Sequence, residues 1–281
     1  MTGLLYVVAT PIGNLSDAGA RAVEVLRSAD LVACEDTRTS RTLLAHHGIA
    51  ARTFALHEHN ERTGTARLIA ELLAGKTVAL VSDAGTPAVS DPGALLVEAA
   101  HRSGIRVIPI PGPSAALAAF SASGFAANQV LIAGFLPSTA GARRKALSGL
   151  DESHPVVFFE APHRVAAAVA DLAARFGPDR EIVIAREITK KFEEIVRLPL
   201  GAASAWLASG PHRQQGEFVL VLGPGAKAAG DAIAEGRRVL AVLLEALPAS
   251  DAARLAARIS GAPRRELYRF ALERKGGESS R

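Results

Sequence analysis

The chain has 281 residues, of which 49% are hydrophobic and 21% charged, and its formal net charge is +4. This composition supports a sizeable core and excludes an intrinsically disordered chain. The single cysteine, Cys34, excludes a disulfide framework and a multi-cysteine zinc site, and no apolar run reaches the roughly 20 residues of a membrane helix. Because an apolar strand begins almost at once, with no basic leader before it, we expect a cytoplasmic protein.

The first part of the chain alternates short apolar runs with amphipathic helical segments. One such segment starts at Glu61 and ends at Gly75. The apolar runs are too short for core helices and predict strands at 4–9, 31–34, 52–56, 77–81 and 106–110. This alternation predicts right-handed βαβ crossovers and a mainly parallel five-stranded sheet with both faces covered. Residues 1–123 are therefore predicted to form an N-terminal α/β domain.

A second set of apolar runs follows, with fewer helical segments between them. It predicts strands at 129–135, 155–159, 180–185, 193–198 and 216–222. The scarcity of helices favours a mixed sheet, so residues 124–225 are predicted to form a second α/β domain.

The last part of the chain is predicted to be a small C-terminal helical module over 226–281. The glycines and proline of 223–225 indicate a linker before it. Within the module, Ser250-Asp251 is the predicted N-cap of one helix and Pro263 the predicted first residue of the next. This spacing resembles a helix-turn-helix pair that could dock a substrate, and the alternative is a hairpin that only packs against the second domain or a dimer partner.

Three loops that follow predicted strands are unusually rich in glycine and proline: 10–17, 82–93 and 109–115. In open α/β sheets, ligands bind beyond the carboxyl ends of the strands. Glycine permits close backbone approaches, and proline stiffens a loop before a ligand arrives. Together the loops predict a preorganised ligand cradle. The alternative for any one loop is a set of tight turns and helix caps, with Asp91 capping the helix that starts near Gly93.

The composition of these loops narrows the class of ligand. Neither G-x-G-x-x-G nor G-x-x-x-x-G-K-[ST] is present, so the dinucleotide and triphosphate fingerprints are absent. None of the three loops contains lysine or arginine. A cationic or neutral nucleoside-like cofactor is therefore favoured.

The run DAGTP at 83–87, followed by SDPG at 90–93, resembles the signature of the tetrapyrrole-methylase-like superfamily. Within it, the chain is most similar to the branch that methylates a cytidine ribose in small-subunit ribosomal RNA. The first loop, TPIGN, departs from the glycine-rich turn usual in tetrapyrrole-acting relatives, which favours the ribosomal branch. Supporting stretches are ATPIGNL at 9–15, CEDTR at 34–38, PGPSA at 111–115, FEAPHR at 159–164 and REITK at 186–190.

The resemblance implies S-adenosylmethionine-dependent 2'-O-ribose methylation of a cytidine in small-subunit (16S) ribosomal RNA. It implies that the methyl donor binds between two α/β domains, that the protein is a homodimer, and that its partner is ribosomal RNA or the small ribosomal subunit. The alternatives are a tetrapyrrole (precorrin-type) methyltransferase and a non-catalytic RNA- or ribosome-binding factor. The implied cofactor contacts are Pro11, Asp83, Ala84, Gly85, Pro87, Ser90 and Ser114, with Phe135 and Pro224 as further candidates.

Polar residues after other strands are candidates for catalysis. A ribose hydroxyl is weakly acidic, so a base or a charge that favours its deprotonated form would help. We predict Glu160, Arg164 and Lys190 as the catalytic residues, and an ion pair within the loop is the alternative for the first two. No metal site is predicted, because the neighbouring residues of His57–His59 would point to opposite faces of a strand.

The remaining candidates concern the substrate. Asp36 and Arg38 follow a strand near the cofactor loops and are predicted to position the RNA or another substrate, and the alternative is simple helix capping. The basic cluster Arg143, Arg144 and Lys145 is a predicted contact for RNA phosphates, which give affinity but no sequence choice. The alternative for this cluster is a solvated face. Other basic residues that could extend the track are Lys190, Lys191, Arg237, Arg238, Arg264, Arg265 and Arg269.

Overall fold

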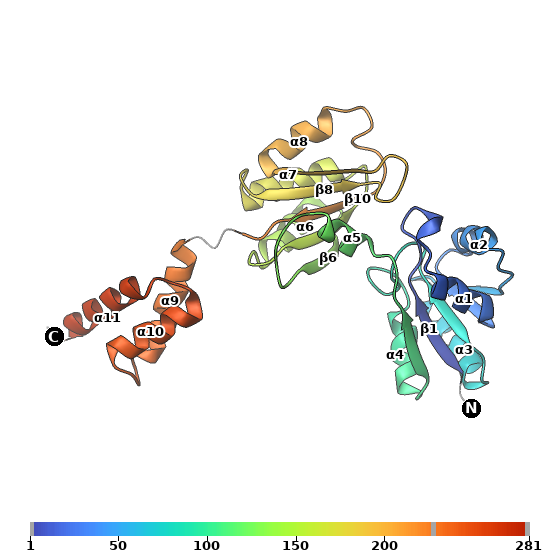
Figure 1. Cartoon of the computed structure of the whole chain (residues 1–281), viewed down its shortest axis with the longest axis horizontal. Helices are drawn as coiled ribbons and strands as arrows, with labels where there is room; N and C mark the ends of the chain where they lie inside the picture. Colours follow the sequence, from blue (N-terminus) through green and yellow to red (C-terminus); the bar gives the residue numbers. More distant parts are fainter. Residues whose placement is uncertain (1–2, 226–228, 279–281) are drawn as a thin grey trace. The chain divides into compact units, whose positions relative to one another are not determined.

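The computed structural model describes residues 3–225 and 229–278. Residues up to Gly223 form one compact unit, and those from Pro224 onward form a second. Figure 1 draws both units. Three residues named in the predicted domain limits, 1, 226 and 281, lie outside the described residues. Within the described ranges, no helix combines the length and the apolar character needed to cross a membrane.

A five-stranded parallel sheet forms the first half of the first unit. Its strand order is β3-β2-β4-β1-β5, and every neighbouring pair is parallel. Every residue of β2 and β4 is buried, as expected of parallel strands covered on both faces. The predicted parallel sheet is confirmed. Its strands are β1 (Leu4–Val8), β2 (Leu31–Cys34), β3 (Thr53–Ala55), β4 (Val78–Val81) and β5 (Arg106–Ile110).

Two helices cover each face of this sheet. A short 3-10 helix, η1 (Leu15–Asp17), precedes α1 (Ala20–Ser28), which packs with α2 (Thr37–His46) on one face. The other face is covered by α3 (Glu61–Leu73) and α4 (Ala94–Arg102). The buried residues of α3 and α4 recur at a spacing of four, which places them on one helical face.

The start of α4 does not use Asp91 as its cap. Its N-cap is Gly93, and the N–H groups of Gly93 and Leu95 donate to Glu61 Oε1 at 2.7 and 3.3 Å. The alternative in which Asp91 caps this helix is therefore wrong. The carboxylate that serves the first turn of α4 comes from the start of α3, and Asp91 lines a cavity described below.

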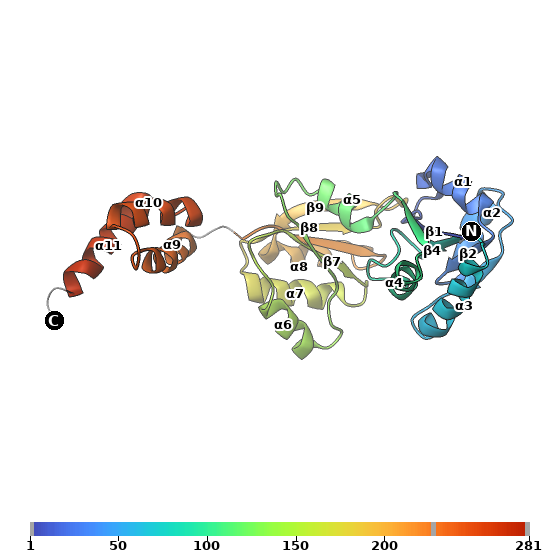
Figure 2. The same cartoon turned by 90° about the horizontal axis from the view of Figure 1, so that it is seen from below.

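A mixed five-stranded sheet forms the second half of the first unit. Its order is β6-β7-β10-β8-β9, with β6 parallel to β7 and the other pairs antiparallel, which confirms the predicted mixed sheet. Figure 2 shows α5 on the opposite side of this sheet from α6 and α7. The strands are β6 (Leu131–Phe135), β7 (Val156–Glu160), β8 (Glu181–Arg186), β9 (Glu194–Pro199) and β10 (Phe218–Leu222). The helices are α5 (Ala115–Ser121), α6 (Ala140–Ser148), α7 (Val165–Phe176) and α8 (Leu200–Ala208).

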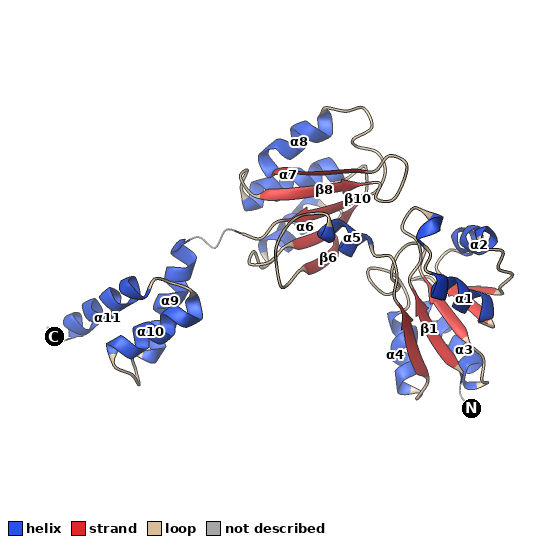
Figure 3. Cartoon of the chain, viewed as in Figure 1, coloured by secondary structure: helices blue, strands red, loops and turns tan. Residues whose placement is uncertain are grey.

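The second unit contains only helices among its described residues, as Figure 3 shows. These are α9 (Ala229–Leu243), α10 (Ala249–Ser260) and α11 (Arg264–Glu278), and small buried residues let them pack closely around Leu240 and Leu267. The N-cap of α10 is Pro248, whose carbonyl accepts from the N–H groups of Asp251 and Ala252. The predicted cap at Ser250-Asp251 is therefore wrong, because the helix begins earlier.

One residue of the predicted phosphate-binding cluster is buried between two helices. Arg143 of α6 is only 5% exposed, and its Nε donates to Asp171 Oδ2 of α7 at 2.6 Å. Arg144 Nε donates to Asp171 Oδ1 at 2.8 Å. The predicted contact between Arg143 and RNA phosphates conflicts with this burial, because the guanidinium joins α6 to α7. Arg144 and Lys145 are exposed.

We predict that Asp171→Asn destabilises the protein by about 3–5 kcal/mol, because it leaves the Arg143 guanidinium buried without a counter-charge. The free energy of unfolding can be measured by urea titration at pH 7, followed by the fluorescence of Trp206, the single tryptophan of the chain. Arg144→Gln is the matched control. The Arg144 side chain is 71% exposed, so its loss should cost about 1 kcal/mol or less.

The same pair predicts a dependence on pH. The hydrogen bond from Arg144, reinforced by Arg143, outweighs burial and lowers the pKa of Asp171 below its ordinary 3.8. The stabilisation is therefore fully present above pH 3.8 and is lost as the pH falls through the lower folded-state value. The difference in stability between the wild type and Asp171→Asn should shrink at acidic pH. A difference that stays constant down to the acid transition would contradict the assignment.

Candidate active site

The three glycine- and proline-rich loops are joined to one another at the carboxyl edge of the first sheet. The N–H of Thr10 donates to Gly85 O at 2.8 Å, and the N–H of Gly85 donates to Thr10 O at 3.0 Å. Thr86 Oγ1 donates to Pro113 O at 3.1 Å. The loops after β1, β4 and β5 therefore form one connected surface, as the sequence predicted.

The middle loop has an unusual backbone. Gly85 has a φ of +82°, a conformation that glycine adopts readily, and a Cβ there would lie 3.4 Å from Ile12 Cγ2. Ala88 and Ser90 also have positive φ values, +64° and +65°. Such conformations cost free energy in non-glycine residues and concentrate at functional sites.

A cavity of about 370 Å³ lies between these loops and the second sheet. Its volume lies within the range of small-molecule sites. The first half of the unit contributes Ile12, Asp83, Ala84, Gly85, Thr86, Val89, Ser90, Asp91 and Ser114, and Ala115 is the first residue of α5. The second half contributes Phe135, Phe159, Glu160, Ala161, Pro162, Glu217, Phe218 and Val219.

The cavity combines an apolar wall with carboxylates. The rings of Phe135 and Phe159 lie 5.6 Å apart at a tilted angle. None of the lining residues is lysine or arginine. Four of them are acidic: Asp83, Asp91, Glu160 and Glu217. This arrangement suits a ligand that carries both an apolar group and positive charge.

Burial and neighbouring charges tune the acids of the middle loop. Burial raises the pKa of Asp83, and the negative charge of Asp36 raises it further, although the N–H of Asp36 donates to Asp83 Oδ1 at 3.0 Å. Burial also raises the pKa of Asp91. A cationic ligand would favour the ionised form of both carboxyl groups, so ligand binding and ionisation support each other here.

Asp36 and Arg38, predicted to position the substrate, form an ion pair at the start of α2. Asp36 is the N-cap of this helix and accepts from the N–H of Arg38 at 2.7 Å. The hydrogen bond from the Arg38 side chain lowers the pKa of Asp36 to about 2. The Arg38 side chain is 86% exposed, so this guanidinium is held by Asp36 yet open to solvent.

Most of the predicted cofactor residues gather at the cavity. Pro11 and Pro87 are not among its lining residues: Pro87 is buried, and Pro11 lines a neighbouring cavity of about 260 Å³. Pro224 begins the second compact unit. The predicted residues that line the cavity are Asp83, Ala84, Gly85, Ser90, Ser114 and Phe135.

Two of the predicted catalytic residues, Glu160 and Arg164, form an ion pair, which is the alternative role that the sequence left open for them. Glu160 is 2% exposed, and its Oε1 accepts from the N–H of Ala161 at 2.9 Å. Arg164 Nε lies 3.0 Å from the same oxygen, and Arg164 Nη2 also donates to Leu136 O. Because Glu160 lines the cavity as well, its carboxylate is both paired and placed at the site.

Lys190, the third predicted catalytic residue, lies between two acids. Its Nζ is 2.9 Å from Glu187 Oε1 and 3.0 Å from Glu217 Oε2. Burial opposes the charge of Lys190, but the hydrogen bonds to Glu187 and Glu217 outweigh it and raise the pKa. Lys190 is therefore an ammonium ion at neutral pH and cannot act as a general base.

Glu217, Phe159 and Val219 line the cavity but were missed by the sequence analysis. Phe159 lies within β7, whereas the sequence points to residues that follow strands, as is appropriate for parallel sheets. Strand β10 is antiparallel to both of its neighbours, so its beginning, rather than its end, reaches the cavity. The mixed character of the second sheet was the available signal.

Comparisons with known proteins agree with this geometry. A family model described as Tetrapyrrole (Corrin/Porphyrin) Methylases matches residues 4–204, and one described as RsmI C-terminal HTH domain matches residues 230–275. A Xylella fastidiosa protein named ribosomal RNA small subunit methyltransferase I is 49% identical over 267 residues, which cover 95% of this chain and 98% of that protein. The Pseudomonas aeruginosa protein of the same name is 48% identical, with 98% of each chain covered.

Solved structures share the fold. Uroporphyrin-III-C-methyltransferase from Thermus thermophilus matches with a TM-score of 0.57 and 21% identity, over 82% of this chain and 98% of that one. A structure of uroporphyrin-III C-methyltransferase from the same organism, complexed with S-adenyl homocysteine, matches with a TM-score of 0.54 and 17% identity, over 79% and 97%. The family model and the full-length relatives lead to one conclusion: the chain is a methyltransferase that belongs to the tetrapyrrole (corrin/porphyrin) methylase family, among relatives named ribosomal RNA small subunit methyltransferase I.

Proposed function

We propose that the protein methylates the 2'-hydroxyl of a cytidine in small-subunit (16S) ribosomal RNA, with S-adenosylmethionine as the methyl donor. The observation that carries the proposal is the similarity, over nearly the whole chain, to relatives named for the small-subunit RNA. The Thermus uroporphyrin methyltransferase is covered almost completely by this chain, yet covers only 82% of it. The additional C-terminal helical unit favours a macromolecular substrate over a tetrapyrrole.

The residues of the cavity fit the proposed donor. S-adenosylmethionine, when bound, supplies a methyl group on a positively charged sulfonium. Asp83 and Asp91 provide negative charge, and Phe135 and Val219 provide apolar surface for a heterocycle. Pro11 and Pro87 would act by stiffening the loops rather than by touching the donor. The proposed donor-binding residues are Pro11, Asp83, Ala84, Gly85, Pro87, Ser90 and Ser114.

Three residues would assist the acceptor. Glu160 would accept the proton of the ribose hydroxyl, because it is the carboxylate that the second half of the unit holds buried at the cavity. Arg164 would keep that carboxylate in place through their ion pair. Lys190 would provide positive charge near the hydroxyl as its oxygen becomes negative. Alignment of the hydroxyl with the donor would supply much of the acceleration.

The RNA would bind outside the cavity. Arg38 is exposed and oriented by Asp36, which suits a phosphate contact near the cofactor loops. Arg144 and Lys145 lie exposed on α6, and Arg143 supports them by fixing α6 to α7. The substrate would be the RNA itself or the small ribosomal subunit, which places the reaction in the cytoplasm. A homodimer is part of the proposal, and the exposed apolar residues of edge strand β6, Leu131 and Ile132, suit contact with a second copy.

The purified protein should transfer labelled methyl groups to small ribosomal subunits that lack the modification. The labelled position should be a cytidine ribose, and that nucleotide should resist alkaline cleavage because a methylated 2'-oxygen cannot attack the neighbouring phosphate. A parallel incubation with a tetrapyrrole acceptor is the control. Label in the tetrapyrrole, or on a base instead of a ribose, would contradict the proposal.

Gly85→Val should weaken binding of S-adenosylmethionine more than tenfold, roughly 1.4 kcal/mol or above. The substitution forces a β-branched residue into a φ of +82° and adds methyl groups at the cavity wall. Isothermal titration calorimetry measures the change. Gly104→Val is the matched control, since Gly104 has a φ of +66° but nothing lies within 4 Å of its Cβ position. Equal losses of affinity in both variants would remove Gly85 from the donor site.

A protein that ends at Gly223 should bind the donor normally but bind and methylate its RNA poorly. The first unit keeps both sheets and the cavity, while the second unit carries exposed arginines on α10 and α11. Arg265 and Arg269 are four residues apart on α11 and could contact neighbouring phosphates. The side chain of Arg274 lies outside the described residues. Calorimetry gives the donor affinity. The logarithm of the RNA-binding constant, plotted against the logarithm of the salt concentration, should have a shallower slope for the shortened protein than for the full chain. Full activity of the shortened protein would exclude a docking role for the second unit.

A further inference from the structure

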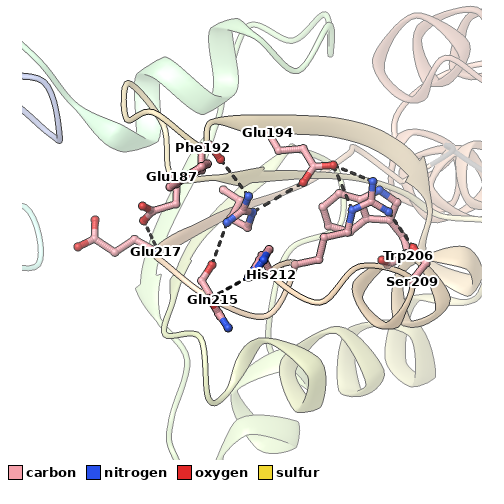
Figure 4. Close-up of polar contacts among 10 residues, drawn as sticks. Glu187, Phe192, Glu194, Trp206, Ser209, His212, Gln215 and Glu217 are labelled. Atoms are coloured by element: carbon pink, nitrogen blue, oxygen red, sulfur yellow. Dashed lines mark hydrogen bonds and ion pairs between the residues drawn. The ribbon is translucent and has the colours of Figure 1, made fainter.

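Arg186, at the end of β8, has a buried guanidinium that contacts two separate segments of the chain. Its Nη1 donates to Gln215 O at 3.3 Å and its Nη2 donates to Phe192 O at 3.0 Å. Its Nε lies 3.7 Å from Glu194 Oε2 on β9. Figure 4 shows these contacts and the carboxylates around them. Arg186 itself is not among the residues that line the cavity.

The two segments are 187–193, which joins β8 to β9, and 209–217, which joins α8 to β10. An arginine suits this task because its planar guanidinium presents several donors in a fixed geometry. A lysine at the same place could not donate to both carbonyls from one plane. The side chain of Arg186 therefore holds the two segments at a defined separation.

The two segments also contact each other closely. The N–H of Glu187 donates to Glu217 O, and the N–H of Glu217 donates to Glu187 Oε1, both at 2.9 Å. Gly216 has a φ of +86°, and a Cβ there would lie 2.5 Å from the Glu187 side chain. Glu187 and Thr189 have positive φ values, +52° and +66°. Strained backbone of this kind persists only where the surroundings hold it.

This close fit determines where Lys190 lies. Its ammonium group bridges Glu187 of the first segment and Glu217 of the second, so its position depends on both. Its side chain also packs on the loop after β1, where a Cβ on Gly13 would lie 2.5 Å from Lys190 Cγ. Ile12, which precedes Gly13, and Glu217, which Lys190 contacts, both line the cavity.

We infer that Arg186 is a positioning residue for methyl transfer: by tying segment 187–193 to segment 209–217, it holds the Lys190 ammonium at the edge of the cavity. This inference deepens the proposed function and rests on it for the role of Lys190. Arg186 touches neither cavity nor acceptor and acts through Lys190. The requirement for two simultaneous carbonyl contacts explains why the residue is an arginine.

The first test follows Lys190 itself and needs no catalytic activity. Nuclear magnetic resonance of protein with ¹³C-labelled lysine, with Lys190→Met to assign the signal, gives the titration of Lys190 in the wild type and in Arg186→Lys. The variant keeps a positive charge but loses one of the two carbonyl contacts. The Lys190 pKa should fall towards its ordinary value of 10.5, because the bridge to Glu187 and Glu217 loosens. An unchanged titration of Lys190 would overturn the inference, whatever the protein methylates.

The second test measures catalysis. Arg186→Lys should slow single-turnover methyl transfer to small ribosomal subunits about tenfold or more, because a misplaced charge loses its effect on the reacting oxygen. The donor Kd and the KM for subunits should stay within about twofold of the wild type, since neither depends on Lys190 in this proposal. In a double-mutant cycle, adding Arg186→Lys to the Lys190→Met variant should not lower its transfer rate any further. If the losses of rate from the two substitutions multiply in the double variant, or if Arg186→Lys keeps the wild-type rate, the inference is overturned. A wild-type protein that methylates no RNA would overturn the proposed function instead.

Arg213→Gln is the matched control for loss of stability. Arg213 donates to the same Glu194 at 2.8 and 3.1 Å and lies in the same segment, but it stacks on Trp206 at 4.5 Å. Figure 4 shows Trp206 and Ser209 at the opposite end of this network from Glu187 and Glu217. Arg213→Gln should lower the melting temperature in differential scanning calorimetry and leave the transfer rate unchanged. A fall in rate equal to that of Arg186→Lys would mean that general loosening of the network explains both.

Discussion

The paired main-chain hydrogen bonds between Thr10 and Gly85 hold the first half of the site together. They join the loop after β1 to the loop after β4, two strands that are neighbours in the parallel sheet. Gly85 uses both its N–H and its carbonyl in this pair and has a φ of +82°. Thr86 extends the connection to the loop after β5. The three loops are thus joined by hydrogen bonds to main-chain groups, so their geometry is set before any ligand binds.

The acidic and the basic side chains of the site differ in their surroundings. Acidic side chains line the cavity, and three basic residues are each held by carboxylates: Arg38 by Asp36, Arg164 by Glu160, and Lys190 by Glu187 and Glu217. A cationic donor would therefore enter a region of negative potential. In the proposed function, an anionic acceptor such as RNA would meet these held cations outside the cavity.

The strands and the glycine- and proline-rich loops could be predicted from the sequence because both depend on local patterns. Short apolar runs indicate buried strands, and the glycines and prolines of the motif at 83–93 predict a loop. The roles of Arg143, Asp91 and Glu217 could not be predicted, because each depends on a partner or a surface far away in the chain. Arg143 forms an ion pair with Asp171, and Glu61 rather than Asp91 caps the first turn of α4. Glu217 reaches the cavity only because β10 runs antiparallel to its neighbours. Charge alone does not distinguish a buried arginine from an exposed one.

The position of β10 has a consequence for the order of folding during synthesis. Strand β10 lies between β7 and β8 at the centre of its sheet, although it is the last of the five strands in the sequence. The first sheet is complete once residue 110 has been synthesised, and its parallel strands can pair while the ribosome is still extending the chain. The second sheet must keep a gap between β7 and β8 until residues 218–222 emerge, and long-range pairing of this kind is slow. Since β10 and Glu217 also close the cavity, a nascent chain acquires its complete binding site only in this final step.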